Sequence, residues 1–406
     1  MITRRHLLGT AGAGAALAVS GLPKFSEAQA AIAELTPGIP EGVASYATMG
    51  TLPGKKPLIQ LSDRPPNYES PIEYLRTPIT PNDQFYVRYH LSDIPEVKAE
   101  GYKIAVGGDG ANGTAEITLD DLKKMPAIEV AAVNQCSGNR RGLSKPRVQG
   151  VEWGYGAMGC ARWKGAKLKD VLNKVGLKKE AIEISFNGAD GPAVAATPDF
   201  IKSIPVWKAI EESTIIAYEM NGQPLPHLNG FPARIVVPGW TGTYWMKHVI
   251  AINVLTKPET NFWMNPAYRV PVGKFPLRDR FLTQENAAST PITEMVVNSL
   301  ITSHRDGDKV KAGKVAVSGM AWDGGYGIRT VQVSTDGGNT WATAKLGEDL
   351  GRFAFRPWSF DLSAKTGNNS VMVSATNKLG QSQTSELIFN PAGYHNNVMQ
   401  NITLTA

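Results

Sequence analysis

The sequence predicts an α+β domain followed by an all-β, immunoglobulin-like sandwich. In the middle of the chain, strand patterns mix with short helices without a regular strand–helix–strand alternation, which favours α+β. After about residue 281, only short alternating apolar patterns separated by turn residues remain. The 41 glycines and 27 prolines in 406 residues imply frequent turns and favour a strand-rich protein over a helical bundle.

The chain divides into four predicted segments. Arg4 and Arg5 precede an apolar run, and Ala28–Ala30 supplies small residues for cleavage. This order is typical of a twin-arginine signal, which exports folded proteins, so we expect a periplasmic location. The predicted segments are the signal peptide at 1–30, a Pro- and Gly-rich extended N-terminal arm at 31–80, the α+β domain at 81–281 and the sandwich at 282–406.

Two predicted strands carry the polar residues of greatest interest. In Gln84–Leu91, side chains alternate in character, so Arg88 and His90 are expected on the same face. Ile128–Cys136 is a second predicted strand, and it ends at a cysteine. Further short strands are predicted at Glu183–Phe186 and Arg234–Val237.

Two short helices are predicted between these strands. Thr118 is a suitable N-cap, acidic residues follow it in the first turn, and Pro126 ends the helix. Leu168–Val175 has apolar residues at helical spacing, and Gly176 is a suitable C-terminal cap.

The C-terminal segment contains alternating apolar pairs and triplets. Turn signals such as Asp336–Asn339 separate them, as an immunoglobulin-like sandwich requires. The expected role of this segment is packing or association. The groups are Val315/Val317, Val331/Val333, Phe353/Phe355, Trp358/Phe360/Leu362 and Val371/Val373/Ala375.

Composition excludes several classes of function. The formal net charge of +6 is small, and no basic run is interleaved with aromatic residues, so nucleic acid is not an expected partner. No stretch of the sequence reaches the roughly 20 apolar residues that a membrane helix needs, so no membrane insertion is expected. The sequence contains no Cys-x-x-Cys-His, so we expect no c-type haem in this chain.

Cys136 is the residue with the most chemical potential. It stands at the end of a predicted strand and is followed by a small-residue turn and by Arg140 and Arg141, an electropositive setting that favours a thiolate. A thiolate is a soft metal ligand or a nucleophile. The residues alone leave open a disulfide with Cys160, a Cys-His enzyme using one of six histidines, and an inert buried cysteine.

The segments Gln135–Arg141 and Phe85–Leu91 resemble the molybdenum site of the sulfite oxidase family. Similar segments follow in the same order, so that the resemblance covers roughly residues 75 to 390. They are Ala161–Leu168, Ala217–Gly222, Gly230–Gly239 and Ser334–Gly338. The resemblance implies a molybdopterin-binding domain followed by an immunoglobulin-like dimerisation domain.

The resemblance also implies a role for each site residue. Cys136 would ligate molybdenum beside the two dithiolene sulfurs of one molybdopterin per chain. Where many relatives carry a histidine before Gly-Phe-Pro-x-Arg, this chain has Asn229, whose amide can still hydrogen-bond a pterin or phosphate oxygen. The substrate pocket would contain Arg88, Arg141, Tyr268 and Trp153, and the cofactor would contact Tyr86, His90, Asp190, Asn229, Arg234, Trp245 and Lys247.

The implied reaction is oxidation of sulfite to sulfate. Electrons would pass to a separate c-type cytochrome, and a homodimer is possible. Within the family, a periplasmic sulfane dehydrogenase subunit is the main alternative. Plant-type nitrate reductase and exported methionine sulfoxide reductase fit less well, because the first has haem and flavin domains and the second lacks the C-terminal sandwich. A cofactor-free binding module built on the sandwich is the alternative outside enzymes.

Overall fold

Strands dominate the part of the chain that the computed structural model describes, which is residues 48–192, 194–272 and 289–406. The predicted signal peptide at 1–30 therefore lies outside the described residues. The described α-helices are short, so the α+β prediction holds only in the sense that a few helical turns flank the sheets. They are α3 (Leu119–Lys124), α4 (Leu168–Leu172) and α5 (Val206–Ala209).

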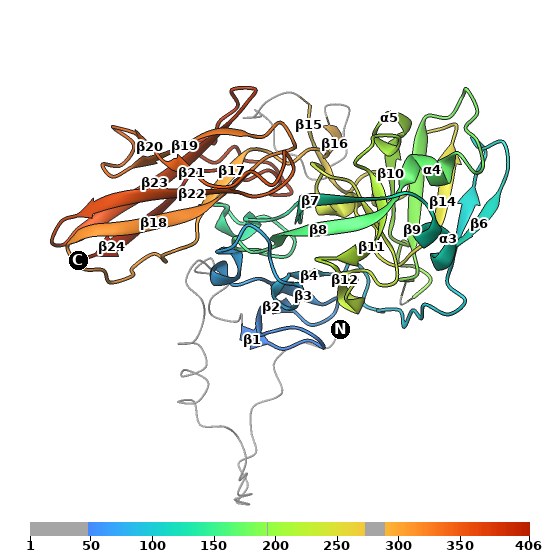
Figure 1. Cartoon of the computed structure of the whole chain (residues 1–406), viewed down its shortest axis with the longest axis horizontal. Coiled ribbons are helices and arrows are strands. Elements are labelled where there is room, and N and C mark those ends of the chain that lie inside the picture. The colour runs from blue at the N-terminus through green and yellow to red at the C-terminus, as the bar shows by residue number, and fades with distance from the viewer. Residues whose placement is uncertain (1–47, 193, 273–288) are drawn as a thin grey trace, which may run out of the picture.

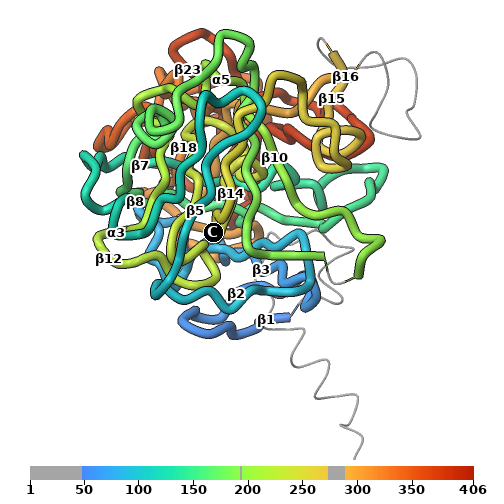
Figure 2. Tube along the Cα trace, turned by 90° about the vertical axis from the view of Figure 1, so that its right-hand side faces the viewer, coloured from blue at the N-terminus to red at the C-terminus, as the bar shows by residue number. Residues whose placement is uncertain are grey.

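The N-terminal segment forms a sheet, where an extended arm was predicted. The sheet has the antiparallel order β1-β2-β3-β4 and lies beneath the larger domain in Figure 1 and along its lower edge in Figure 2. Its strands are β1 (Thr48–Gly50), β2 (Leu58–Ser62), β3 (Asn67–Glu69) and β4 (Val87–Arg88).

The strand predicted at Gln84–Leu91 is much shorter than expected. Only Val87 and Arg88 pair, with Tyr68 and Asn67 of β3. A 3-10 helix, η2 (Asn82–Gln84), precedes them. The alternation is present in the sequence, but β3 has only three residues, so the partner limits the length of the ladder.

A central sheet in the order β12-β11-β8-β7, with β13 beside β11, carries the cysteine. The antiparallel pair β7·β8 runs without interruption from Ala127↔Ala166 to Gln135↔Met158. Cys136 follows at the end of this ladder, as predicted. The strands are β7 (Ala127–Gln135), β8 (Met158–Lys167), β11 (Ile215–Met220), β12 (Gln223–Pro224) and β13 (Arg234–Val236).

A second sheet, in the order β10-β9-β14-β5-β6, lies at the right of Figure 1 and faces the viewer in Figure 2. The predicted helix start is confirmed here, because Thr118 and Asp121 form a reciprocal capping box at α3. The strands are β5 (Lys103–Gly107), β6 (Ala115–Thr118), β9 (Glu183–Gly188), β10 (Ile201–Pro205) and β14 (Val249–Leu255).

The C-terminal residues form two four-stranded antiparallel sheets that enclose an apolar core, at the left of Figure 1. The alternating residues point inward as predicted, except Phe353 and Phe355, which lie before β22 and outside any strand. One sheet has β17 (Asn298–Ile301), β18 (Gly313–Trp322), β22 (Arg356–Ala364) and β21 (Lys345–Leu346). The other has β20 (Ala342–Thr343), β19 (Ile328–Ser334), β23 (Asn368–Asn377) and β24 (Gln400–Thr405).

The sandwich packs directly behind the strand that ends at Cys136. The backbone N–H of Val133 donates to the carbonyl of Phe353 at 2.9 Å. The indole Nε1 of Trp322 donates to Oε1 of Gln135 at 2.6 Å, and this contact is buried. The position of the cysteine therefore depends on both domains. None of the helices in the described residues is long and apolar enough to span a membrane.

Candidate active site

A pocket opens where β4, the end of β7 and the loops around β13 meet. Cys136 lies in its wall with Arg88 and Tyr268 and with all seven residues expected to contact the cofactor. Sequence motifs far apart in the chain therefore converge on one cavity. The wall consists of Phe85, Tyr86, Arg88, Tyr89, His90, Asn134, Cys136, Ser137, Asp190, Phe200, Leu228, Asn229, Arg234, Gly242, Thr243, Trp245, Met246, Lys247 and Tyr268.

The turn after β7 fixes Cys136. The backbone N–H of Cys136 donates to the carbonyl of Ala157 at 2.9 Å, and its carbonyl accepts from the N–H of Asn139 at 2.9 Å. Cys136 and Cys160 are both free, so the disulfide alternative is not what the structure contains. Cys160 lies fully buried on β8, where burial raises the pKa of its thiol to about 12 and makes it inert.

The two arginines after the cysteine contact the C-terminal residues, and Arg141 is not among the described lining residues of the pocket. Nε of Arg141 donates to the carbonyl of Ala392 at 2.7 Å, and its guanidinium lies over the ring of Tyr394. Arg140 donates to Oδ1 of Asn298 and to a carbonyl of the same C-terminal segment. Both side chains therefore attach the cysteine turn to the second domain.

Arg141 still affects the pocket indirectly. Tyr394 stacks on Tyr268, with ring centroids 5.6 Å apart and planes 13° apart, and Tyr268 lies in the pocket wall. Arg141 is thus one aromatic layer behind the wall. Its positive charge lowers the pKa of Tyr268, although burial has the larger, opposite effect and raises that pKa overall.

Trp153 is likewise not among the described lining residues of the pocket. Its indole is fully buried and packs edge-on against Tyr86, with ring centroids 6.4 Å apart. The predicted contact residue Tyr86 does line the pocket, and its hydroxyl donates to Oδ1 of Asn134. Trp153 therefore supports a wall residue.

Half-buried His90 and buried Tyr268 form a pair on the wall. Nε2 of His90 lies 2.5 Å from the Tyr268 hydroxyl, and the imidazole stacks on Phe200 with centroids 3.6 Å apart. Burial, and the nearby charge of Arg88 after it, lower the pKa of His90 well below its ordinary range, so the ring is neutral. With its proton on Nε2, the neutral imidazole can donate to the Tyr268 oxygen, which holds the phenol in a fixed direction and leaves its O–H free to donate to a ligand.

Lys202 is a buried cation behind the pocket wall that the sequence did not reveal. It is fully buried on β10, and its Nζ donates to the carbonyl of Trp263 at 2.6 Å. Its ammonium lies 4.9 Å from the ring centroid of Tyr268 and 4.8 Å from that of Tyr244. Burial lowers its pKa to about 7. No motif surrounds Lys202, so only the fold could place it here.

Two cations, Arg234 and Lys247, lie together in the pocket wall. Arg234 is 4% exposed, and its two terminal nitrogens donate to the carbonyls of Asn229 and Trp245 at 2.8 and 2.9 Å. Nζ of Lys247 donates to the carbonyl of Arg88 at 2.8 Å. Burial, followed by the charge of Arg234, lowers the pKa of Lys247 well below its ordinary range.

Among the described residues that line this pocket, one is a carboxylate, Asp190. Burial raises its pKa to about 6, although the charge of Lys247 opposes that shift. The described lining thus contains three cations and one carboxylate, which leaves an excess of positive charge. The cations are Arg88, Arg234 and Lys247. Such an excess is unfavourable unless an anion binds there.

The pocket fits a molybdopterin with a phosphate group. Within the described residues, four buried polar atoms of its wall lack a hydrogen-bond partner. A glycine at 242 lets the wall segments pack closely, because a Cβ there would lie 3.0 Å from the carbonyl of Gln135, 3.1 Å from the Tyr86 hydroxyl and 3.2 Å from Oδ1 of Asn134. The unpaired atoms are Asn134 Nδ2, Ser137 Oγ, Arg234 Nε and Thr243 Oγ1.

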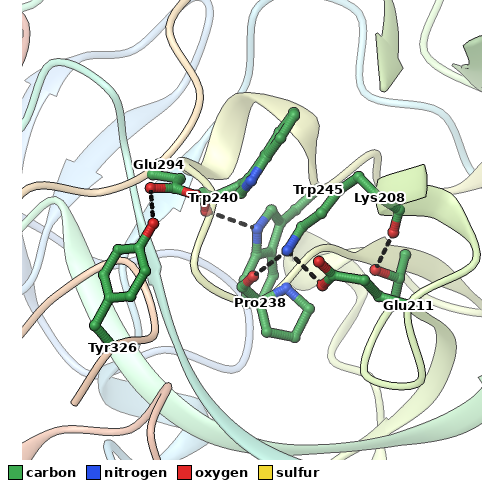
Figure 3. A network of polar contacts seen from close by, with 8 residues as sticks. Lys208, Glu211, Pro238, Trp240, Trp245, Glu294 and Tyr326 are labelled. Atoms are coloured by element: carbon green, nitrogen blue, oxygen red, sulfur yellow. Dashed lines mark hydrogen bonds and ion pairs between the residues drawn. The ribbon is translucent and has the colours of Figure 1, made fainter. Parts of the chain in front are cut away.

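Trp245 forms part of the pocket wall, and a hydrogen bond from its indole fixes its position. Its Nε1 donates to the carbonyl of Trp240 at 3.0 Å (Figure 3). Beside it, Nζ of Lys208 donates to the carbonyl of Pro238 at 3.2 Å and pairs with Glu211 at 2.7 Å. Both contacts fix the loop that follows β13, and with it the position of Trp245.

The family models place this pocket, with Cys136 in its wall, in a class of protein, the oxidoreductases that bind molybdopterin. Residues 90–263 match the family model described as the oxidoreductase molybdopterin binding domain, and residues 289–406 match the Mo-co oxidoreductase dimerisation domain. The chain belongs to the sulfite oxidase family.

Its similarity to individual relatives extends over most of the chain. It is 36% identical over 334 residues to the mitochondrial sulfite oxidase of Homo sapiens, covering 79% of this chain and 60% of that one. It is 34% identical over 331 residues to the sulfite oxidase of Arabidopsis thaliana, covering 78% and 82%. The chain thus spans about 60% of the length of the first animal relatives.

The sulfane dehydrogenase SoxCD of Paracoccus pantotrophus shares the fold. The TM-score is 0.74 and the superposition covers 98% of this chain and 93% of that one, at 23% sequence identity. This likeness concerns the fold alone.

Proposed function

We propose that this chain oxidises sulfite to sulfate at a single-molybdopterin molybdenum centre and passes the electrons to an external c-type cytochrome. The observation that carries this proposal is the convergence of Cys136, Arg88 and Tyr268 on the wall of one cation-rich pocket. Relatives at 34 to 36% identity that are named sulfite oxidase support the choice of substrate.

When bound, the molybdenum cofactor supplies oxygen-atom transfer and storage of two electrons. The Cys136 thiolate would ligate the metal, and Arg234 and Lys247 would hold the phosphate. Arg88 would bind the sulfite dianion, and the hydroxyl of Tyr268, held by His90, would donate a hydrogen bond to one of its oxygens.

The stoichiometry requires an electron acceptor. Sulfite gains one oxygen that derives from water and releases two protons and two electrons. Two ferricytochrome c molecules would accept these electrons one at a time. We also propose that the chain forms a homodimer through residues 289–406, because they match a dimerisation domain.

Sulfane dehydrogenation is the second candidate. Of the two arginines expected to bind sulfite, Arg88 alone is among the described lining residues, whereas Arg141 lies behind Tyr394. A carrier-bound sulfane sulfur has less charge than the sulfite dianion and needs fewer cations. The position of Arg141 therefore favours sulfane dehydrogenation as the second candidate, and an assay with both substrates distinguishes it from sulfite oxidation.

The test is steady-state reduction of cytochrome c by molybdenum-loaded protein with sulfite, thiosulfate and a sulfane carrier in turn. Fastest reduction with sulfite supports the proposal, and reduction with the sulfane carrier alone supports the second candidate. No reduction with sulfite by a fully loaded sample would overturn the proposal. Cys136→Ser is the inactive control, and an active sample without molybdenum would favour a different class of protein.

We further propose that the C-terminal sandwich is immunoglobulin-like.

We also propose that residues 1–30 direct export of the folded chain to the periplasm by the twin-arginine route. The order of charge, apolar run and small residues in the sequence supports the export proposal. Replacing Arg4 and Arg5 with lysine should leave the protein in the cytoplasm in a cell fractionation experiment, and unchanged export would contradict the proposal.

A further inference from the structure

Lys55 is a buried cation directly behind the cofactor pocket. It belongs to the turn between β1 and β2, and only 7% of its surface is exposed. It lies outside residues 90–263, which match the molybdopterin-binding model. Its Nζ donates to the carbonyl of Asn82 and to Oδ1 of Asn229, each at 2.6 Å. The side chain thus crosses from the N-terminal sheet to the pocket wall.

The contact with Lys55 determines which way the Asn229 amide faces. A lysine ammonium has three donors and no acceptor, so only the amide oxygen can face it. The Nδ2 of Asn229 is therefore turned away from Lys55 and toward the pocket, which Asn229 lines. Its described partner there is the carbonyl of Tyr86 at 3.4 Å, a long contact that leaves the amide able to donate to a ligand.

The charge of Lys55 adds to that of the pocket. Its positive charge lowers the pKa of Lys247, after burial and the larger effects of Arg234 and Arg88. Burial lowers the pKa of Lys55 itself to about 7, and Asp83 offsets this only in part. A bound anion would reverse the desolvation effect, because an opposite charge nearby favours the protonated amine.

We propose that Lys55 is part of the anion cradle of the cofactor pocket and is a positioning residue that orients Asn229 to donate from Nδ2 to the cofactor phosphate. The inference rests on the proposed cofactor. It also gives the N-terminal sheet a function, because this sheet would complete the cradle from outside the domain that bears the cysteine. The turn that carries Lys55 would close the phosphate end of the pocket.

The first experiment compares Lys55→Met with a matched control, Lys56→Met. Lys56 is the next residue, but its side chain is 51% exposed and pairs with Asp83 on the surface at 3.4 Å. Apoprotein is titrated with inorganic phosphate, and the thermal midpoint is followed as a function of concentration. Loss of one buried charge-assisted contact should weaken phosphate binding about tenfold in Lys55→Met. Lys56→Met should match the wild type.

A second readout is cofactor retention. After purification and prolonged dialysis, pterin fluorescence and molybdenum content per chain should fall several-fold in Lys55→Met and stay unchanged in Lys56→Met. Equal retention and equal phosphate affinity in Lys55→Met and the wild type would overturn the inference. So would a lower midpoint of the apoprotein without any change in phosphate affinity, because the role would then be structural.

Asn229→Asp keeps the test decisive if Lys55→Met does not fold. An aspartate keeps the size of asparagine and can pair with Lys55, but it lacks the Nδ2 donor and adds negative charge. Phosphate binding and pterin retention should then be lost while the apoprotein stays folded, and normal retention would overturn the inference. If the wild type itself holds no pterin, the proposed function fails, while the phosphate titration still decides the role of Lys55.

Discussion

Glu69 attaches the N-terminal sheet to the loop that supports the cysteine turn. The residue is 3% exposed, and its carboxylate oxygens accept from the backbone N–H groups of Gly154 and Gly156 at 2.7 and 2.9 Å. The same loop receives the N–H of Arg140 at the carbonyl of Gly154. The protonation state of Glu69 therefore affects how stably this loop, and with it the cysteine turn, is held.

Burial raises the pKa of Glu69 from its ordinary value of 4.5 to about 7, against the opposing effect of the backbone donors. The folded protein thus holds a proton at pH values where the unfolded chain has lost it. The contribution of Glu69 to the free energy of unfolding is therefore complete below pH 4.5 and is lost as the pH rises to about 7. A shift of about 2.5 units corresponds to about 3 kcal/mol of unfolding free energy.

Glu69→Gln removes this titration. The difference in unfolding free energy between the variant and the wild type should shift by about 3 kcal/mol in favour of the variant between pH 4.5 and 7.5. Denaturant unfolding of apoprotein across that pH range measures it, with exposed Glu116→Gln as the control. A difference that is constant with pH, or that shifts toward the wild type, would refute the reasoning. In the second case, the backbone donors would outweigh burial.

Three further substitutions test the site and its supports. Arg88→Met should raise KM for sulfite about ten- to a hundredfold, because a buried anion loses a charged partner, and an unchanged KM would remove Arg88 from the substrate pocket. Tyr394→Leu should lower kcat/KM about two- to tenfold by removing the ring stacked on Tyr268, whereas Tyr394→Phe should retain activity; equal rates for both variants would contradict this. Arg140→Gln should lower the thermal midpoint by weakening the contact with Asn298, and calorimetry showing no change would contradict a role in joining the domains.

Local features of the fold could be predicted from the sequence. The strand ending at Cys136 and the capping box at Thr118 depend on residues close together in the chain, and both are present. The residues that the resemblance assigned to the cofactor all line one pocket, although Asp190, Trp245 and Lys247 lie outside the quoted motifs.

Long-range contacts account for the features that the sequence did not reveal. Arg141 turns to the carbonyl of Ala392, 251 residues away, because the C-terminal segment passes over the cysteine turn. Lys55 reaches Asn229 across 174 residues, from a segment expected to be an extended arm. The length of β4 was set by its partner strand and not by its own alternation. None of these contacts leaves a periodic signal in the sequence.

The central claim is that the thiolate of Cys136 ligates a molybdenum atom held by one molybdopterin. X-ray absorption at the molybdenum edge tests it most directly, on wild-type protein and Cys136→Ser with metal content measured in parallel. We expect one molybdenum per chain in the wild type, with one more sulfur ligand than any metal that Cys136→Ser retains. An equal number of sulfur ligands in the two proteins, or a wild type that oxidises sulfite without molybdenum, would contradict it.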